Sequence, residues 1–245
     1  MTRFPPSNVT RQATNTRPRL TPAEIAEVAT THFKQDVQQI SAPGGEHRAS
    51  VRVKFANGSV IATQRPEARG FDMEAKVLRR LSSAGAPVPR FLGRRNGVLF
   101  QEDVGRSRLS VQLAKQSAER RLDIAKTAFQ SLWELKAKAA ETGLATELSI
   151  LAMNQDWLTL FCNTPATLSR KLEIAAPALD IENLGRVVVQ PPKSFVKWDA
   201  RPGNATLSPD GRVLWFDWEH AGRRAGPEDF GFLAGDKFWP LGADT

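Results

Sequence analysis

Apolar and polar residues alternate with a period of two along several short stretches in the first half of the chain. This period places every second side chain on one face, as in a half-buried β-strand. Asn57-Gly58 and Asn96-Gly97 separate neighbouring stretches, and both dipeptides are strong signals for a tight hairpin turn. We expect the stretches to form a small antiparallel sheet. The predicted strands are residues 36–40, 50–55, 59–65, 90–94 and 98–102.

Apolar residues recur with helical spacing through much of the remaining sequence. Thr21 is a predicted N-cap, because Pro22 suits the first turn and Glu24 completes a capping box. A second helix is predicted for residues 71–84, where apolar residues recur with helical spacing until a glycine ends the pattern. Beyond residue 105 helical patterns dominate as far as residue 180, and a short strand is expected at residues 187–190.

These patterns divide the chain into three parts. Residues 1–20 are rich in proline and arginine and lack periodicity, so we expect a flexible basic tail, although an acid-free, arginine-rich start also fits an organellar transit peptide. Residues 21–105 combine the predicted sheet with one inserted helix, and residues 106–245 form a larger, mainly helical part. The fold class is therefore α+β with two lobes.

Composition narrows the class of protein. Hydrophobic residues make up 41% of the 245 positions, which is ample for a core, and no run of about 18 apolar residues predicts a membrane span. The single cysteine, Cys162, excludes an intramolecular disulfide and fits a reducing compartment, so we expect a cytoplasmic protein. The net charge of +8 favours anionic partners. The arginines are spread along the chain, however, so a dedicated nucleic-acid surface is not indicated.

Residues 195–219 carry the clearest chemistry, reading as strand, polar loop, strand, tight turn and strand. Asp199 and Asn204 lie in the loop, and Asp217 ends the strand that returns towards Asn204. One carboxylate can orient an acceptor hydroxyl while two oxygen ligands hold Mg²⁺ on phosphates, so this order suits phosphoryl transfer. Because Asp217 lies among apolar residues, we expect a buried carboxylate that needs a metal or cation partner. Asp199 precedes a Pro-Gly turn and could also serve only as a loop cap.

Two motifs in this region resemble a known family. Residues 198–204, Trp-Asp-Ala-Arg-Pro-Gly-Asn, and residues 216–219, Phe-Asp-Trp-Glu, are similar to the aminoglycoside phosphotransferase and choline-kinase-like family. The usual motifs of that family are His-Gly-Asp-x-x-Pro-Gly-Asn and Ile-Asp-Trp-Glu. Shorter matches at residues 71–75, 87–89 and 99–105 follow in the right order, so the resemblance covers about residues 36–235. It implies a protein-kinase-like fold and a small-molecule kinase that uses ATP or GTP with Mg²⁺.

The resemblance also implies roles for particular residues. Asp199 would be the catalytic base, and Asn204 and Asp217 would bind Mg²⁺. Glu74, on the inserted helix, would face a cation such as Arg65 on the preceding strand. The remaining nucleotide contacts would come from a hinge that meets the adenine through its backbone and from a loop over the phosphates: Glu102, Asp103 and Val104, and Gly44 and Gly45.

Four features depart from the family pattern. Thr63 stands where a phosphate-binding lysine is usual, and Arg65 lies two residues on, on the same face of the strand, where it could replace the charge. Lys197 replaces the histidine that begins the catalytic loop and would contact a phosphate or pair with an acid. The Gly44-Gly45 pair alone is a poor match to a phosphate-binding loop. The chain also stops soon after Phe230, where relatives continue with more helices, so the C-terminus is expected to be truncated or the acceptor site unusually open.

The sequence thus predicts a phosphotransferase that moves a γ-phosphoryl group to a hydroxyl of a small molecule. Because the chain is basic, a neutral or anionic acceptor is expected rather than a polycationic aminoglycoside. A nucleotide-binding scaffold without turnover is the alternative, motivated by Thr63 and Lys197. Only the overall charge favours a third possibility, a basic nucleic-acid binder. The three histidines are too scattered to predict a zinc site.

Overall fold

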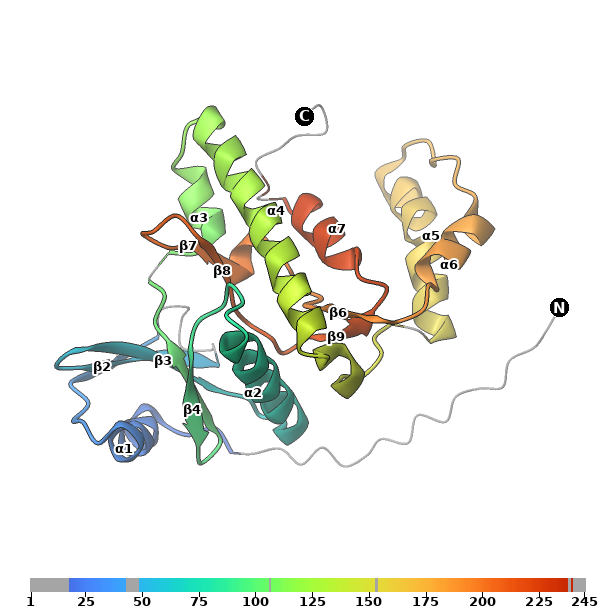
Figure 1. Ribbon diagram of the computed structural model, residues 1–245. Coiled ribbons are helices and arrows are strands. Elements are labelled where there is room, and N and C mark those ends of the chain that lie inside the picture. The colour runs from blue at the N-terminus through green and yellow to red at the C-terminus, as the bar shows by residue number, and fades with distance from the viewer. Residues whose placement is uncertain (1–17, 43–48, 106, 153, 238, 240–245) are drawn as a thin grey trace. The chain divides into compact units, whose positions relative to one another are not determined.

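A computed structural model describes residues 18–42, 49–105, 107–152, 154–237 and 239 (Figure 1). The contacts of the chain divide it into two compact units. The first comprises residues 1–72 and 92–100, and the second comprises residues 73–91 and 101–245. The division predicted at residue 105 stays a prediction.

The first unit opens with helix α1, Pro22–Phe33, which begins as the sequence predicts. The Thr21 hydroxyl accepts a hydrogen bond from the backbone N–H of Glu24, while the Glu24 carboxylate accepts one from the backbone N–H of Thr21 at 2.7 Å. This reciprocal capping box satisfies two of the backbone donors that a helix N-terminus leaves without partners. The predicted helix is therefore confirmed.

A five-stranded sheet, in the order β1-β2-β3-β5-β4, completes the first unit and continues briefly into the second. Strands β1, β2 and β3 are antiparallel neighbours, as predicted. The register pairs Phe55 with Gly58, so the first hairpin turns on Ala56 and Asn57, one residue earlier than expected. The strands are β1 Gln39–Ser41, β2 Ser50–Phe55, β3 Gly58–Gln64, β4 Phe91–Arg95 and β5 Val98–Glu102.

One face of this sheet packs against α1 to form the core of the first unit. Val53 pairs with Val60 across the β2–β3 hairpin, and both side chains are buried together with Ile25 and Ala29 of α1. Two-residue alternation in the strands and three-to-four-residue spacing in the helix place these groups on facing surfaces. Burial of this apolar area stabilises the unit by about 25 cal/mol per Å².

Helix α2, Ala68–Ser83, leads from the first unit into the second. The second unit is mainly helical, and its long helix α4, Ala118–Glu141, contacts β6, β8 and α7 (Figure 1). Buried Leu132 and Leu135 lie on its contact face. The other elements are α3 Leu109–Ala114, η1 Leu144–Glu147, α5 Gln155–Leu172, α6 Ile181–Val188, β6 Ser194–Val196, η2 Pro202–Asn204, β7 Ala205–Leu207, β8 Val213–Trp215, β9 Gly222–Arg224 and α7 Glu228–Ala234.

The strand predicted at residues 187–190 is wrong. Val187 and Val188 belong to α6, which Asp180 caps by accepting a hydrogen bond from the backbone N–H of Asn183 at 2.9 Å. The run of valines favours a strand locally, but the cap and the packing of α6 on α5 decide for a helix. No helix among the described residues is long and apolar enough to span a bilayer.

Candidate functional site

The polar loop and the hairpin that follows it have the predicted form. Strand β6 leads into residues 197–201, the short helix η2 closes on Asn204, and β7 and β8 then pair with Ala205 opposite Trp215. The backbone N–H of Phe216 donates to the carbonyl of Asn204 at 3.1 Å. The chain that carries Asp217 therefore returns beside Asn204, as the sequence predicts.

Asp199 is held by two donors from its own loop. The Arg201 guanidinium reaches both carboxylate oxygens of Asp199, with Nε 2.9 Å from Oδ1 and Nη2 3.0 Å from Oδ2. The side-chain amide of Asn204 donates to Oδ2 at 2.6 Å and to the Asp199 carbonyl at 3.1 Å. The Asp199 side chain is 18% exposed. Two of the predicted site residues thus touch each other directly.

Asn204 and Asp217 supply the oxygen atoms that a magnesium ion prefers. Because Nδ2 of the buried Asn204 faces Asp199, its Oδ1 is the atom suited to ligate a cation. Asp217 lies just beyond β8 and is half-buried rather than fully buried as expected. Its backbone is left-handed, with φ of 68°, a conformation that costs a residue other than glycine about 1–3 kcal/mol.

These donors fit a magnesium ion better than a metal held by protein alone. Among the described residues, no group of three or more His, Cys, Asp or Glu could hold a metal. Mg²⁺ commonly takes one or two protein oxygens and completes its octahedron with water and nucleotide phosphates. One carboxylate and one amide oxygen are consistent with that pattern.

Lys197 connects the two functional segments. Its side chain is fully buried, and Nζ donates to the carbonyl of Asp217 at 2.7 Å and to the carbonyl of Asp199 at 3.3 Å. Burial lowers the pKa of Lys197 below its ordinary 10.5, because the charged amine loses hydration. Four acidic residues act against this shift: Asp217, Asp199, Asp229 and Glu74. The expected pairing of Lys197 with an acid is therefore only an electrostatic attraction without a direct hydrogen bond to a carboxylate. The hydrogen bonds of Lys197 go to main-chain oxygens.

Asp229 of α7 is a positioning residue to which the sequence analysis gave no role. It is fully buried, and its carboxylate accepts hydrogen bonds from the backbone N–H groups of Lys197 at 2.9 Å and Trp198 at 2.8 Å. The Lys136 ammonium, from α4, neutralises it at 3.0 Å. In the sequence, an aspartate that opens a helix carries no signal of these distant contacts.

Trp198 also received no role from the sequence. Its backbone is left-handed, with φ of 70°, at the position where the usual family motif has glycine. A bulky residue rarely adopts this conformation, which persists only where the surroundings compensate for it. The ring lies 5.9 Å from that of Trp157 and 5.5 Å from that of Phe232, measured between centroids.

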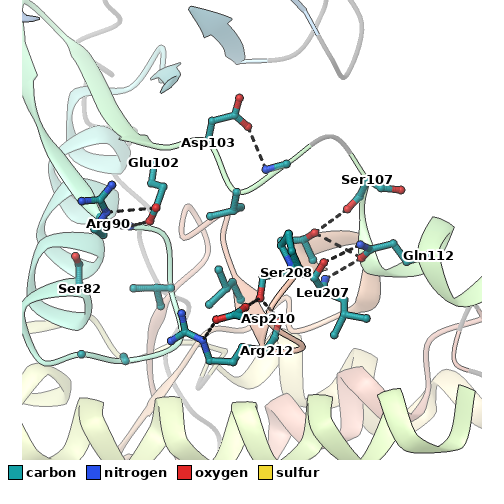
Figure 2. Close-up of a pocket in the computed structure, with 18 residues that line it drawn as sticks. Ser82, Arg90, Glu102, Asp103, Ser107, Gln112, Leu207, Ser208, Asp210 and Arg212 are labelled. Carbon is teal, nitrogen blue, oxygen red and sulfur yellow. Dashed lines mark hydrogen bonds and ion pairs between the residues drawn. The ribbon is translucent and has the colours of Figure 1, made fainter. Parts of the chain in front are cut away.

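The predicted hinge residues Glu102, Asp103 and Val104 line a cavity of about 1040 Å³ within the second unit (Figure 2). Glu102 pairs with Arg90 at 3.3 Å, and Asp103 accepts a hydrogen bond from the backbone N–H of Gly105 at 3.2 Å. The tip of the β7–β8 hairpin and the end of α2 complete the lining. None of the three predicted catalytic and metal-binding residues lines it: Asp199, Asn204 and Asp217.

The remaining predicted residues belong to other segments of the chain. Glu74 is buried on α2, in the same unit as Lys197. Arg65 belongs to the first unit, so its predicted ion pair with Glu74 stays a prediction. Thr63, also in the first unit, shares a hydrogen bond of 2.8 Å with the hydroxyl of Ser50. Gly44 and Gly45 lie outside the described residues.

Comparison with known proteins places these features in a family. The family model of the phosphotransferase enzyme family matches residues 37–244, most of the chain. The chain belongs to the phosphotransferase enzyme family. The resemblance of its two motifs is thereby confirmed. No curated protein matches the sequence.

Solved phosphotransferase structures share the fold. A type VIII aminoglycoside-3'-phosphotransferase is 19% identical, with a TM-score of 0.54 over 90% of this chain and 87% of that one. Spectinomycin phosphotransferase is 11% identical, with a TM-score of 0.58 over 90% and 75%. Macrolide 2'-phosphotransferase from Brachybacterium faecium is 16% identical, with a TM-score of 0.54 over 85% and 76%. These structures confirm the predicted α+β, protein-kinase-like fold.

Proposed function

We propose that this protein transfers the γ-phosphoryl group of ATP or GTP to a hydroxyl of a small molecule. The observation that carries the proposal is that Lys197 binds the main-chain carbonyls of Asp199 and Asp217, while the Asn204 side chain donates directly to the Asp199 carboxylate. Membership of the phosphotransferase family supports the reaction type. A related structure described as a ternary complex with streptomycin and ATP supports the use of a nucleotide.

Asp199 is the proposed catalytic base. The acceptor oxygen forms a bond to the γ-phosphorus while the bond from that phosphorus to the β–γ bridging oxygen breaks. The nucleoside diphosphate leaves with that electron pair, and the hydroxyl proton passes to the Asp199 carboxylate and then to solvent. Arg201 and Asn204 hold this carboxylate in one orientation, so that the acceptor meets a positioned base.

Asn204 and Asp217 are the proposed magnesium ligands. Bound Mg²⁺ would neutralise charge on the phosphates of the nucleotide. Lys197 and Asp229 keep the two segments in place through their hydrogen bonds to the main chain. The buried Lys197 therefore supports the ligands rather than contacting the phosphates itself.

The remaining nucleotide contacts are proposed from the family resemblance. The backbone of Glu102, Asp103 and Val104 would meet the adenine, and Gly44 and Gly45 would lie near the phosphates. Arg65 would supply the positive charge that Thr63 lacks, held by Glu74. We also propose a cytoplasmic location, in keeping with the single cysteine, and an acceptor that is neutral or anionic.

A thermal-shift titration with ATP and GTP, with and without Mg²⁺, tests the proposal. At one hundred times its Kd, a ligand that binds only the native state adds about 2.7 kcal/mol of stability, a rise in Tm of about 5–10 °C for a chain of this size. Asp217→Ala should lose the magnesium-dependent part of this rise. Asp123→Ala, which removes an exposed aspartate of α4, is the matched control and should keep it. No shift with either nucleotide would refute the proposal.

The alternative is a nucleotide-binding protein without turnover. The specific observation in its favour is Thr63 at the usual lysine position, where its hydroxyl is engaged with Ser50. Release of ADP from ATP in the presence of a screen of hydroxylated acceptors separates the two functions. Binding without release of ADP from any acceptor would favour the alternative.

A further inference from the structure

Four aromatic rings form a continuous row that includes the residue before Asp199. Phe161 and Trp157 of α5 stack at 5.0 Å, Trp157 lies 5.9 Å from Trp198 of the catalytic loop, and Trp198 lies 5.5 Å from Phe232 of α7. Phe161 is 43% exposed and Phe232 is 40% exposed. The row thus presents apolar rings to solvent at both ends and includes Trp198, the residue before the proposed base.

The backbone of Trp198 indicates that the ring itself has a use. Its left-handed conformation favours glycine, and a tryptophan there is strained. Strained residues of this kind persist where packing compensates for them, and they cluster at active sites. Here Trp157 and Phe232 provide the packing, while the strain directs a large ring into the row beside Asp199.

Arg224 determines which ligands suit this row. Its guanidinium carbon lies 5.1 Å from the ring centre of Trp157 and 5.5 Å from that of Trp198. The side chain is buried and donates to Glu228 at 3.0 Å and to the carbonyl of Val188 at 2.9 Å. This fixed cation, itself paired with Glu228, already occupies electron-rich ring faces of Trp157 and Trp198, so those faces are not open to a cationic ligand. Neutral rings remain free to pack on the exposed ends.

We propose that this ring row, defined as Phe161, Trp157, Trp198 and Phe232, is the acceptor subsite, and that the acceptor is a neutral hydroxylated molecule bearing an apolar ring. The ring of the acceptor packs on the row, and its hydroxyl reaches Asp199, the residue next to Trp198. The inference rests on the proposed phosphotransferase function and adds a substrate class to it. Trp198 then determines specificity in addition to shaping the loop.

A matched pair of probes tests the subsite by binding alone. Phenyl β-D-glucoside and methyl β-D-glucoside offer the same hydroxyls and differ in the apolar ring. Saturation-transfer NMR on the full chain, with and without Mg²⁺ and ADP, gives a Kd for each. We expect the phenyl compound to bind about tenfold more tightly, because one ring gains a stacking partner.

Substitutions in the ring row test whether the preference for the phenyl compound arises there. Trp198→Gly suits the backbone and removes the ring, and Phe161→Ala removes an exposed ring without disturbing the loop. Each should bring the ratio of the two Kd values close to one. Trp133→Ala is the matched control, because Trp133 is 71% exposed on α4 and packs on Phe230, outside the row. It should leave the ratio unchanged.

Several outcomes would overturn the inference. One is equal binding of the two probes, and another is a phenyl preference that survives both Trp198→Gly and Phe161→Ala. A dimer in sedimentation that Phe161→Ala dissociates would assign the exposed rings to a second copy instead. Nucleotide binding without a phenyl preference would refute the subsite and leave the proposed function standing. A phenyl preference without nucleotide binding would refute the row as an acceptor subsite together with the proposed function.

Discussion

At the scale of single residues, the candidate site depends on main-chain contacts more than on the side chains that the motifs display. Asp199 and Asp217 are the recognisable acids, but Lys197 binds the carbonyl oxygens of both. Asp229 accepts the backbone donors at the start of the same loop. The buried Lys197 and the buried Asp229 therefore hold the loop and the segment of Asp217 through main-chain hydrogen bonds.

Replacing Lys197 by methionine tests whether Lys197 holds the segments of Asp199 and Asp217 in place for the proposed reaction. Methionine fills a similar volume but donates no hydrogen bond, so the segments of Asp199 and Asp217 lose their common anchor. We expect kcat to fall about 10- to 100-fold, as when groups that orient metal ligands are removed, with little change in KM for ATP. Release of ADP measures this, with Lys138→Met on the surface of α4 as control. An unchanged kcat would contradict the role.

Glu228 makes part of the stability depend on pH. Partial burial raises its pKa, but hydrogen bonds from its own backbone, the Arg224 side chain and the Gly226 N–H outweigh burial and leave the pKa below the ordinary 4.5. Its contribution is therefore present above about pH 4.5 and lost as the pH falls through the lower folded-state value.

Glu228→Gln should accordingly be less stable than the native chain at pH 7, by about 1–2 kcal/mol. The difference should shrink as the pH falls below about 4.5, because the native carboxyl then becomes protonated too. Urea unfolding at pH 7 and at pH 4 checks both statements. A difference that stays constant with pH would argue against an ionised Glu228 as the stabilising group.

At the scale of elements, the sequence predicts a helix or a hairpin well where that element depends on a few neighbouring residues. The capping box of α1 and the strands around Asn96-Gly97 agree with the sequence, because each depends on a few neighbouring residues. Asn96 and Gly97 both have positive φ, 46° and 77°, as the tightest hairpin turns require. The strand expected at residues 187–190 fails, since packing on α5 outweighs the propensity of valine.

Two glycine substitutions should act with opposite signs. Gly97→Ala forces a side chain into the left-handed region and should destabilise the protein by about 1–2 kcal/mol. Gly70→Ala lies in α2, where an added methyl group meets no atom within 4 Å, and should stabilise it by about 0.5–1 kcal/mol. Thermal unfolding of both variants measures the effect. Equal signs would show that backbone conformation is not the cause.

At the scale of the whole molecule, charge bears on the acceptor. The chain carries 34 basic and 26 acidic residues, a formal net charge of +8. A field of this sign attracts nucleotide phosphates and repels polycations. Family membership establishes the reaction type, but low identity to antibiotic phosphotransferases shows a shared fold alone.

Gentamicin, the ligand in one related structure, should therefore not be phosphorylated by this protein. We expect no gentamicin-dependent release of ADP at low ionic strength. Any weak binding should strengthen between about 0.01 and 0.15 M salt, as the Debye length falls from about 30 to about 8 Å and screens the repulsion. Calorimetry and an ADP assay measure these effects. Rapid turnover of gentamicin would contradict the expected neutral or anionic acceptor.

The sequence by itself determined the order of the proposed catalytic and metal-binding residues along the chain and most of the local secondary structure. The spacing of Asp199, Asn204 and Asp217 and the hairpin that follows can be read from neighbouring residues, because a loop and a tight turn are local. Tertiary structure alone decided what surrounds them. Lys136 and Asp229 are 93 positions apart, and Trp157 meets Trp198 only because α5 packs beside the loop that carries Asp199. Contacts between such distant residues depend on the packing of whole elements, which no local pattern encodes.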